Sequence, residues 1–225
     1  MKNLFFILTH IIFIPFISNS QSLVSDQLVT EQLIKMPSRT DVLDSDFDGS
    51  PYLDDSFQLG TIFIGDHPGV TCPMRYDIYQ DVMEVKYKGR LMQIIPSELI
   101  RFISINKDRL VPKKYPMGSG MIQGLLFELD TGKINLYKKR NLEFEPWRAA
   151  RAQESGPKKA RFKDMLDSYF IEFPNQKIVL IEKAKDITLL FHDHRKEIDE
   201  YLVKNKLKMK DVKLIEFIRF YNTLQ

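Results

Sequence analysis

The chain has 225 residues, of which 44% are hydrophobic and 28% are charged, and its formal net charge is +3. This composition is typical of a globular protein and excludes a largely disordered chain, because disordered chains hold too few apolar residues to bury a core. The single cysteine, Cys72, excludes an intramolecular disulfide. After residue 20, no apolar stretch approaches the roughly 20 residues that a membrane-spanning helix requires.

Charge is distributed unevenly along the chain. Residues 21–132 contain 11 Lys/Arg and 16 Asp/Glu, whereas residues 133–225 contain 21 Lys/Arg and 14 Asp/Glu. A basic C-terminal half can present a basic face to an anionic polymer, to lipid headgroups or to an acidic protein. Nucleic acid is not expected as a partner, because the basic residues form no recognised nucleic-acid-binding module.

The first twenty residues predict export. Lys2 supplies a positive start, residues 4–17 are mostly apolar, and the small residues Ser18 and Ser20 form a cleavage site. The apolar part is short for a membrane span and is interrupted by a histidine and a proline. We therefore predict a cleaved signal peptide over residues 1–20 and a location in the periplasm or at the cell surface.

Residues 21–50 are polar and acidic, and they contain one short amphipathic pattern. Leu28, Leu33 and Ile34 have helical spacing, which predicts a short helix in this N-terminal segment. From residue 51 the pattern changes to that of a sheet, and we expect an antiparallel β domain over residues 51–183. The remaining residues, 184–225, are expected to form helices that pack on this sheet.

Alternating apolar and charged residues predict the strands of the β domain. Met83, Val85 and Tyr87 alternate with charged residues, so the apolar side chains share one face of a half-buried strand. The expected strands cover residues 61–64, 74–79, 83–87, 91–95, 100–105, 124–129, 133–144, 169–173 and 177–181. This regular spacing predicts an α+β protein whose antiparallel β meander closes into a sandwich or a partial barrel.

A basic segment without apolar period separates the later strands. Residues 145–164 are predicted to form a mobile basic loop. An aromatic side chain among cations can bind a polysaccharide, an anionic lipid or an acidic protein. The alternative is a solvated loop whose tryptophan covers the sheet edge. The candidate partner-binding residues are Trp147, Arg148, Arg151, Lys158, Lys159 and Arg161.

The end of the chain has helical periodicity. Asp186 can cap a helix whose apolar stripe continues through His194 to Tyr201, and Asn205 is a plausible left-handed end. Asp211 can cap a second helix with a broad apolar face. These patterns predict a two-helix hairpin that buries its apolar faces against the sheet or a partner.

One acidic stretch has the spacing of a calcium loop. Asp44, Asp46 and Asp48 occupy positions 1, 3 and 5, a glycine occupies position 6, and Asp55 occupies position 12. Calcium is therefore the one candidate cofactor. A proline at position 8 and weak helical patterning on both sides favour the alternative of an acidic, solvated linker.

No catalytic motif emerges from the remaining residues. Gly118-Ser119-Gly120 lacks the spacing of a nucleophile elbow. His192 and His194 would point in different directions on a helix, so they would not hold one metal ion together. We predict that the protein is not an enzyme.

Four stretches of the chain carry a resemblance to known proteins. They are GSPYLDDSFQLGTIFIGD, YDIYQDVMEVKYKGRLMQI, EIDEYLVKNKLK and the ending FIRFYNTLQ. Over most of residues 49–225 the chain resembles a family of small exported proteins that is typical of the Bacteroidota and has no known activity. The resemblance implies a periplasmic or cell-surface location and assigns no functional residue.

Together these features predict an envelope protein that binds a partner or forms a scaffold through the basic loop or the helical hairpin. Two alternatives remain open. A curled sheet can carry an apolar ligand or lipid, and the chain could be an enzyme of an unrecognised type.

Overall fold

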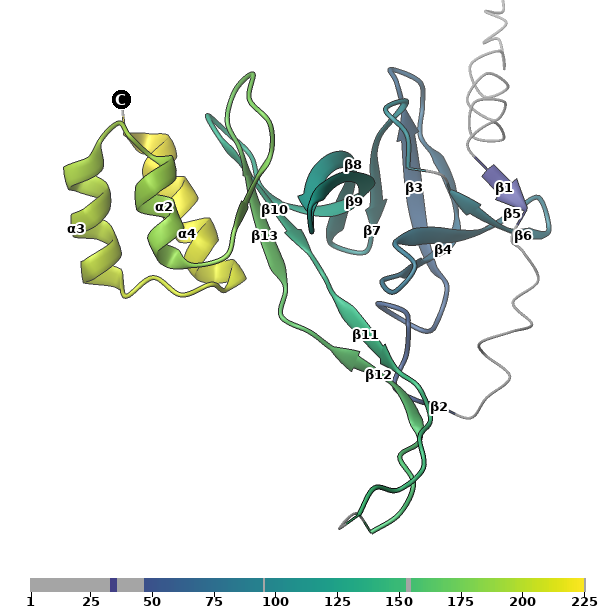
Figure 1. Cartoon of the computed structure of the whole chain (residues 1–225). Helices are drawn as coiled ribbons and strands as arrows, with labels where there is room; N and C mark the ends of the chain where they lie inside the picture. The colour runs from purple at the N-terminus through teal and green to yellow at the C-terminus, as the bar shows by residue number, and fades with distance from the viewer. Residues whose placement is uncertain (1–32, 36–46, 95, 153–154, 225) are drawn as a thin grey trace, which may run out of the picture.

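The computed structural model describes residues 33–35, 47–94, 96–152 and 155–224. Figure 1 shows a curled sheet with helices at one end and a hairpin that extends away from the body. The strands are β1 (Leu33–Lys35), β2 (Phe47–Asp48), β3 (Gln58–Ile64), β4 (Val70–Asp77), β5 (Val82–Tyr87), β6 (Arg90–Ile94), β7 (Ile100–Ile105), β8 (Asp108–Met117), β9 (Gly120–Asp130), β10 (Asn135–Lys139), β11 (Leu142–Glu145), β12 (Ala160–Asp164), β13 (Ser168–Glu172) and β14 (Val179–Ile181).

The strands form two sheets in the described residues. The larger sheet has eleven strands in the order β1-β6-β5-β4-β3-β7-β8-β9-β10-β13-β14, and the smaller one has the order β11-β12-β2. Within the larger sheet all neighbours are antiparallel. Three helices follow, α2 (Ala184–Leu190), α3 (Arg195–Asn205) and α4 (Asp211–Thr223). The predicted α+β architecture, with a β meander followed by helices, is confirmed.

Alternation along the strands places their apolar residues in one core. Met83 and Val85 on β5 are fully buried, and Met83 pairs with Ile94 on β6 while Val85 pairs with Met74 on β4. These side chains belong to a cluster of buried residues from strands β3 to β9, which fills the inside of the curled sheet. Burial of large apolar side chains of this kind stabilises the fold by about 1.5–3 kcal/mol each.

The helices cover the other end of the large sheet. Leu214, Phe217 and Ile218 on α4 are fully buried and belong to one cluster with Leu136 on β10 and Ile171 on β13. Asp211, the first residue of α4, accepts hydrogen bonds from two strand residues. The donors are Lys138 Nζ at 2.5 Å and the Tyr169 hydroxyl at 2.7 Å. Apolar packing and these polar contacts together fix α4 on the sheet.

The helical region contains three helices where two were predicted. The first expected helix stops at Leu190, and the chain then leaves helical geometry before α3 starts at Arg195. His194 is the N-cap of α3 with a left-handed φ of 53°, so it lies in no continuous helical stripe. The interruption arises because Phe191 packs against the rings of Phe173, Phe217 and Tyr221.

The predicted caps also shift. Asp186 is the third residue of α2 and accepts a hydrogen bond from the Lys183 backbone N–H at 2.8 Å, so it stabilises the helix start from inside the first turn. The left-handed residue after α3 is Lys206, with a φ of 46°, and Asn205 is the last helical residue.

The N-terminal helix prediction is wrong where the structure describes it. Residues 33–35 form β1, which pairs with β6 along the edge of the large sheet. Leu28 lies outside the described residues, as does the whole expected signal peptide. Pairing with an available sheet edge overrides the weak helical pattern, since edge strands offer unpaired backbone groups. Among the residues that the structure describes, no helix is long and apolar enough to cross a membrane.

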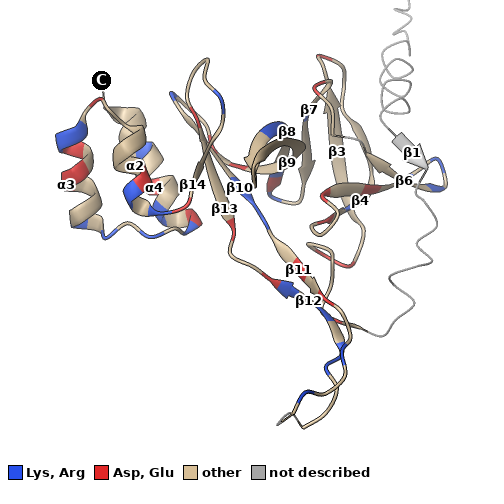
Figure 2. Cartoon of the chain, in the orientation of Figure 1, with Lys and Arg blue, Asp and Glu red and all other residues tan. Residues whose placement is uncertain are grey.

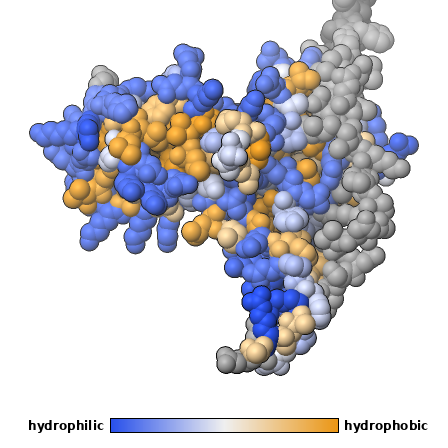
Figure 3. All heavy atoms as spheres, viewed as in Figure 1, coloured by the Kyte–Doolittle hydropathy of each residue, from blue (hydrophilic) through white to orange (hydrophobic). Residues whose placement is uncertain are grey.

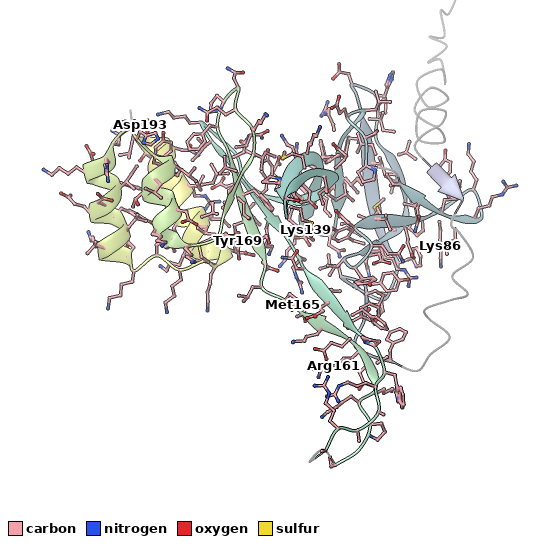
Figure 4. All side chains as sticks on the ribbon, in the orientation of Figure 1. Lys86, Lys139, Arg161, Met165, Tyr169 and Asp193 are labelled. Carbon is pink, nitrogen blue, oxygen red and sulfur yellow. The ribbon has the colours of Figure 1, made fainter. Side chains whose placement is uncertain are left out.

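A buried polar network joins the turn between β4 and β5 to strands β4, β8 and β10. Asp81 Oδ1 accepts hydrogen bonds from the Tyr76 hydroxyl at 2.6 Å and from Lys139 Nζ at 2.7 Å, and Asp81 Oδ2 accepts one from the Tyr115 hydroxyl at 3.0 Å. Lys139 is only 4% exposed. A Cβ atom on Gly124 would lie 2.1 Å from Asp81 Oδ2, so only glycine permits this approach. Figure 4 shows Lys139 on the strand that continues toward the extended hairpin.

Candidate functional site

A hairpin arm, defined here as residues 142–164, extends away from the body of the molecule. It consists of β11, β12 and the chain between them, and Figure 1 shows it as a continuation of the β10–β13 pair. Leu142 pairs with Asp164 and Glu145 pairs with Arg161. Nearer the tip, Arg148 and Lys158 exchange two backbone hydrogen bonds of 3.0 and 2.9 Å. The predicted basic loop is therefore in part a strand ladder, which ends at the Arg148–Lys158 bridge in the residues that the structure describes.

Hydrogen bonds fix the root of the arm. The backbone N–H of Met165 donates to the Asn141 carbonyl at 3.0 Å, and Asn141 Nδ2 donates to the Leu166 carbonyl at 2.8 Å. Arg140 forms ion pairs with Asp164 and Asp167, at 2.8 and 3.4 Å. These contacts span the gap between the two sheets, so the arm has a defined direction relative to the body.

Aromatic rings hold the inner part of the arm. The Phe162 ring lies 5.0 Å from Phe144, 5.2 Å from Phe47 and 5.3 Å from Tyr79, measured between centroids. Phe47 comes from β2, which pairs with β12 in parallel. Aromatic pairs in such edge-to-face and tilted arrangements add about 0.5–1.5 kcal/mol each beyond the area that they bury. The arm is therefore fastened to a segment far away in the sequence.

Gly49 permits the close contact between this segment and the arm. It has a φ of +78°, and a Cβ at this position would lie 2.7 Å from the Phe162 carbonyl oxygen. We expect Gly49→Ala to release the β2 segment from β12 and to lower the free energy of unfolding by about 2 kcal/mol, from backbone strain and steric overlap. Trypsin should then cleave the arm faster after Arg148 and Arg151.

Gly89→Ala is the matched control for this variant. Gly89 has a similar φ of +75°, but no atom lies within 4 Å of the Cβ position. The Gly89→Ala variant should lower the free energy of unfolding only by the strain of the backbone conformation and should leave tryptic cleavage of the arm unchanged. Equal cleavage rates in the two variants would contradict the role assigned to Gly49.

Several basic residues of the arm have acidic partners. Arg161 Nε lies 2.6 Å from Glu145 Oε2, Lys163 Nζ lies 3.3 Å from Glu145 Oε1, and Lys159 Nζ lies 3.0 Å from Asp48 Oδ1. The hydrogen bond from Arg161 lowers the pKa of the Glu145 carboxyl. These pairs keep the middle of the arm close to electrically neutral. By sequence, residues 146–158 at the tip have three Lys/Arg and one Asp/Glu, and Figure 2 shows blue segments there.

Trp147 lies at the start of the tip and is 62% exposed. Beside it, a groove of about 540 Å³ runs along the arm. On the face shown in Figure 3, hydrophilic and hydrophobic residues lie side by side along the arm. The groove is lined by Asp48, Glu143, Phe144, Glu145, Pro146, Arg148, Lys158, Lys159 and Arg161.

The structure brings most of the predicted partner-binding residues together. Figure 4 shows Arg161 on the arm below Met165, which lies at the root. Arg148, Lys158, Lys159 and Arg161 line the groove, and Trp147 adjoins it in the chain. Arg151 lies further toward the tip and is exposed. No sequence pattern indicates that Phe47 and Tyr79 hold the arm, although Phe144 and Phe162 border the cations at positions 148–161.

The predicted calcium residues are only partly described. Asp48 forms its ion pair with Lys159, and Asp55 accepts a hydrogen bond from the Ser50 hydroxyl. Asp44 and Asp46 lie outside the described residues. Within the described part of the chain, no group of three or more His, Cys, Asp or Glu side chains could hold a metal ion. Calcium binding stays a prediction for the complete loop.

The cysteine, the two histidines considered for a metal ion and the Gly-Ser-Gly stretch are dispersed over the fold. Cys72 is buried, and burial raises the pKa of its thiol to about 11, so the thiol is protonated at neutral pH. His192 is exposed, and His194 caps α3. Gly118 and Ser119 form the turn between β8 and β9.

The chain was compared with protein-family models, with curated proteins and with solved structures, and none of the three comparisons found a match.

Proposed function

We propose that the protein is an exported, non-catalytic envelope protein that binds an acidic partner protein through the tip of the arm. The observation that carries this proposal is the exposed Trp147 beside Arg148 and Lys158, toward the tip of the arm. The arm itself is held by the hydrogen bonds at its root and by the contact of β12 with β2. Between residues 146 and 158, outside the ion pairs of the middle of the arm, the chain has three Lys/Arg and one Asp/Glu. An acidic surface complements this charge.

The chemistry of the tip matches that of residues with large contributions to binding. Tryptophan and arginine are enriched among interface residues whose truncation costs about 2 kcal/mol or more. A fastened arm also loses less conformational freedom on binding than a flexible loop does, which leaves more of the contact energy as affinity. The arm therefore supports binding by preorganisation as well as by charge.

The alternative of a ligand carrier has less support from the packing. A carrier needs an apolar cavity within the curl, but side chains fill that space in the described structure. Met74, Met83 and Ile103 are 0–1% exposed and belong to the same cluster. At interior packing densities such a cluster leaves little room for a ligand.

Photocrosslinking in the cells that produce the protein tests the proposal. A photoreactive phenylalanine analogue at position 147 should give a discrete adduct with one acidic protein. The same analogue at Leu59, which is 71% exposed on β3, should not give this adduct. No adduct at position 147, or the same pattern at both positions, would contradict binding through the arm.

The identified partner then allows a quantitative test. Trp147→Ala and Arg148→Glu should each weaken its binding by about thirtyfold, the factor that corresponds to 2 kcal/mol. Increasing salt should weaken binding of the unmodified protein and affect Arg148→Glu less, because exposed charges are screened within about 10 Å at 0.1 M salt.

A further inference from the structure

The β8–β9 hairpin continues beyond the large sheet as a two-stranded ribbon. β7 pairs with β8 only over residues 108–110, and β10 pairs with β9 only over residues 127–130. Between these limits, β8 and β9 pair with each other from Val111↔Leu126 to Met117↔Gly120. We call residues 113–123 the finger. Its outer part, residues 117–123, is exposed at every position.

The end of the finger is apolar. Met117, Met121 and Ile122 are 52%, 42% and 36% exposed. Met121 pairs with Pro116, whereas Ile122 pairs with Tyr115, so exposed apolar side chains lie on both faces of the ribbon. An apolar end of this kind suits end-on insertion into an apolar layer better than packing of one face against a groove.

Lysines surround the base of this apolar end. Lys113 and Lys114 lie on opposite faces of the ribbon, and exposed Lys177 lies in the turn between β13 and β14. The finger and the turn between β13 and β14 come together around a hollow of about 320 Å³. Residues 113–123 and 173–181 contain no Asp or Glu. The hollow is lined by Lys113, Lys114, Met121, Glu172, Gln176, Lys177 and Ile178.

The one carboxylate in the hollow has its charge compensated. Glu172 accepts hydrogen bonds from Lys113 Nζ at 2.8 and 2.9 Å, from the Tyr137 hydroxyl at 2.6 Å and from Asn135 Nδ2 at 3.2 Å. Burial alone would raise the pKa of Glu172, but these hydrogen bonds outweigh it and lower the pKa. Lys114 and Lys177 therefore dominate the local charge.

We propose that the finger docks the protein on an anionic lipid membrane, with Met117, Met121 and Ile122 inserted at the headgroup boundary and with Lys114 and Lys177 bound to lipid phosphates. Lys114 precedes Met117 by three residues, which is about 10 Å along a strand. This distance agrees with the roughly 5–10 Å depth at which interfacial segments bury their apolar side chains. The lysines then lie at the level of the phosphates.

Sedimentation with lipid vesicles tests this proposal. The purified protein should bind vesicles of phosphatidylcholine mixed with phosphatidylglycerol and bind vesicles of pure phosphatidylcholine much less. Lys114→Glu combined with Lys177→Glu should weaken binding by more than the roughly fivefold per residue expected for loss of a lysine, because each substitution also adds a negative charge. Lys196→Glu combined with Lys204→Glu, at exposed positions of α3, is the matched control and should retain binding if the finger is the docking site.

The apolar contribution is tested by a second set of variants. Met117→Ser, Met121→Ser and Ile122→Ser combined should reduce vesicle binding at least about tenfold without a change in melting temperature, since all three side chains are exposed. The matched control combines Leu59→Ser, Leu99→Ser and Val203→Ser, at positions that are 71%, 53% and 79% exposed.

Insertion depth gives an independent measurement. In a Trp147→Phe background, Met121→Trp should be quenched by lipids that are brominated near the headgroup. The proposal is overturned if the protein binds neither type of vesicle, if the finger variants and their controls bind equally, or if vesicle binding is lost with Trp147→Ala and Arg148→Glu but not with the finger variants.

Discussion

Above about pH 10 the protein is expected to unfold within one to two pH units, because buried tyrosines must keep their protons in the folded state. Five tyrosines are 1–5% exposed. Burial raises the pKa of each, and nearby carboxylates raise it further. The pKa of Tyr221 rises to about 12. The five residues are Tyr76, Tyr115, Tyr137, Tyr169 and Tyr221.

The sign of the pH effect follows from these pKa values. In the unfolded chain, tyrosine has a pKa near 10, whereas the folded protein retains the proton at higher pH. The stability that these groups contribute is therefore complete below about pH 10 and decreases as the pH rises toward the folded pKa values. Each tyrosine lowers the free energy of unfolding by about 1.4 kcal/mol per pH unit, so five together lower it by about 7 kcal/mol per unit. The free energy of unfolding of a native protein is about 5–15 kcal/mol, so it falls to zero within one to two pH units above pH 10.

Two optical signals measure this transition. The ultraviolet absorbance of tyrosinate and the circular dichroism of the backbone should change together in one steep step. Tyr221→Phe removes one of the five groups and should make the pH dependence shallower. Its hydrogen-bond partner Asp193 has a side chain that is 51% exposed, so water can replace the lost contact. Absorbance that changes near pH 10 while the circular dichroism stays constant would contradict the prediction.

Asp81→Asn is expected to lower the free energy of unfolding by about 3 kcal/mol. The substitution retains the shape of the side chain and tolerates the φ of 57° at this position, but it removes the charge opposite the buried Lys139 ammonium. Breaking a buried ion pair by removing one partner costs about 3–5 kcal/mol. The lower end of this range applies, because Asp77 also stabilises the charged form of Lys139.

Urea denaturation measures this loss, and two further variants define its origin. Asp66→Asn removes a carboxylate whose side chain is fully exposed and should change the stability by less than about 0.5 kcal/mol. Lys139→Met in the Asp81→Asn background removes the unpaired buried charge and should recover part of the loss. A double variant less stable than Asp81→Asn alone would show that packing around Lys139, and not its charge, matters most.

The sheet was largely predictable because alternation is a local signal. The pattern at residues 100–105 matches the bounds of β7, and β5 and β6 lie within one residue of their predicted ranges, whereas β3 and β4 begin three and four residues earlier than predicted. β8 was missed because it contains Pro112, Pro116 and two lysines. The prolines fit because, beyond Leu110, β8 pairs with β9 on one side only, so the absent N–H groups break no ladder.

The helical region shows where a periodic pattern misleads. Ile187 and Ile198 are both buried, as the stripe predicts, but they belong to separate helices. The sequence does not show that Phe191 enters an aromatic cluster with Phe173 and Tyr221, which are distant in the chain. Tertiary packing decides such breaks, and a local pattern carries no information about it.

The candidate site was predictable in composition and not in shape. Clustered cations and a tryptophan are visible in the sequence, but the arm depends on Phe47 and Tyr79, whose contacts with Phe162 join distant segments. The ladder of β11 and β12 was also hidden, because Arg161 and Lys163 lie on the outer positions of a strand whose inner residue is Phe162.

The parallel pairing of β2 with β12 has a consequence for the order of folding. Most neighbours in the large sheet are joined by short turns, so their hairpins can form as soon as both strands are available. Phe47 meets Ala160 only after nearly the whole sheet has been synthesised between them. Closing so long a loop is entropically costly until the intervening strands are in place. The pairing of β2 with β12 is therefore expected to be among the last contacts to form and, on unfolding, among the first to open.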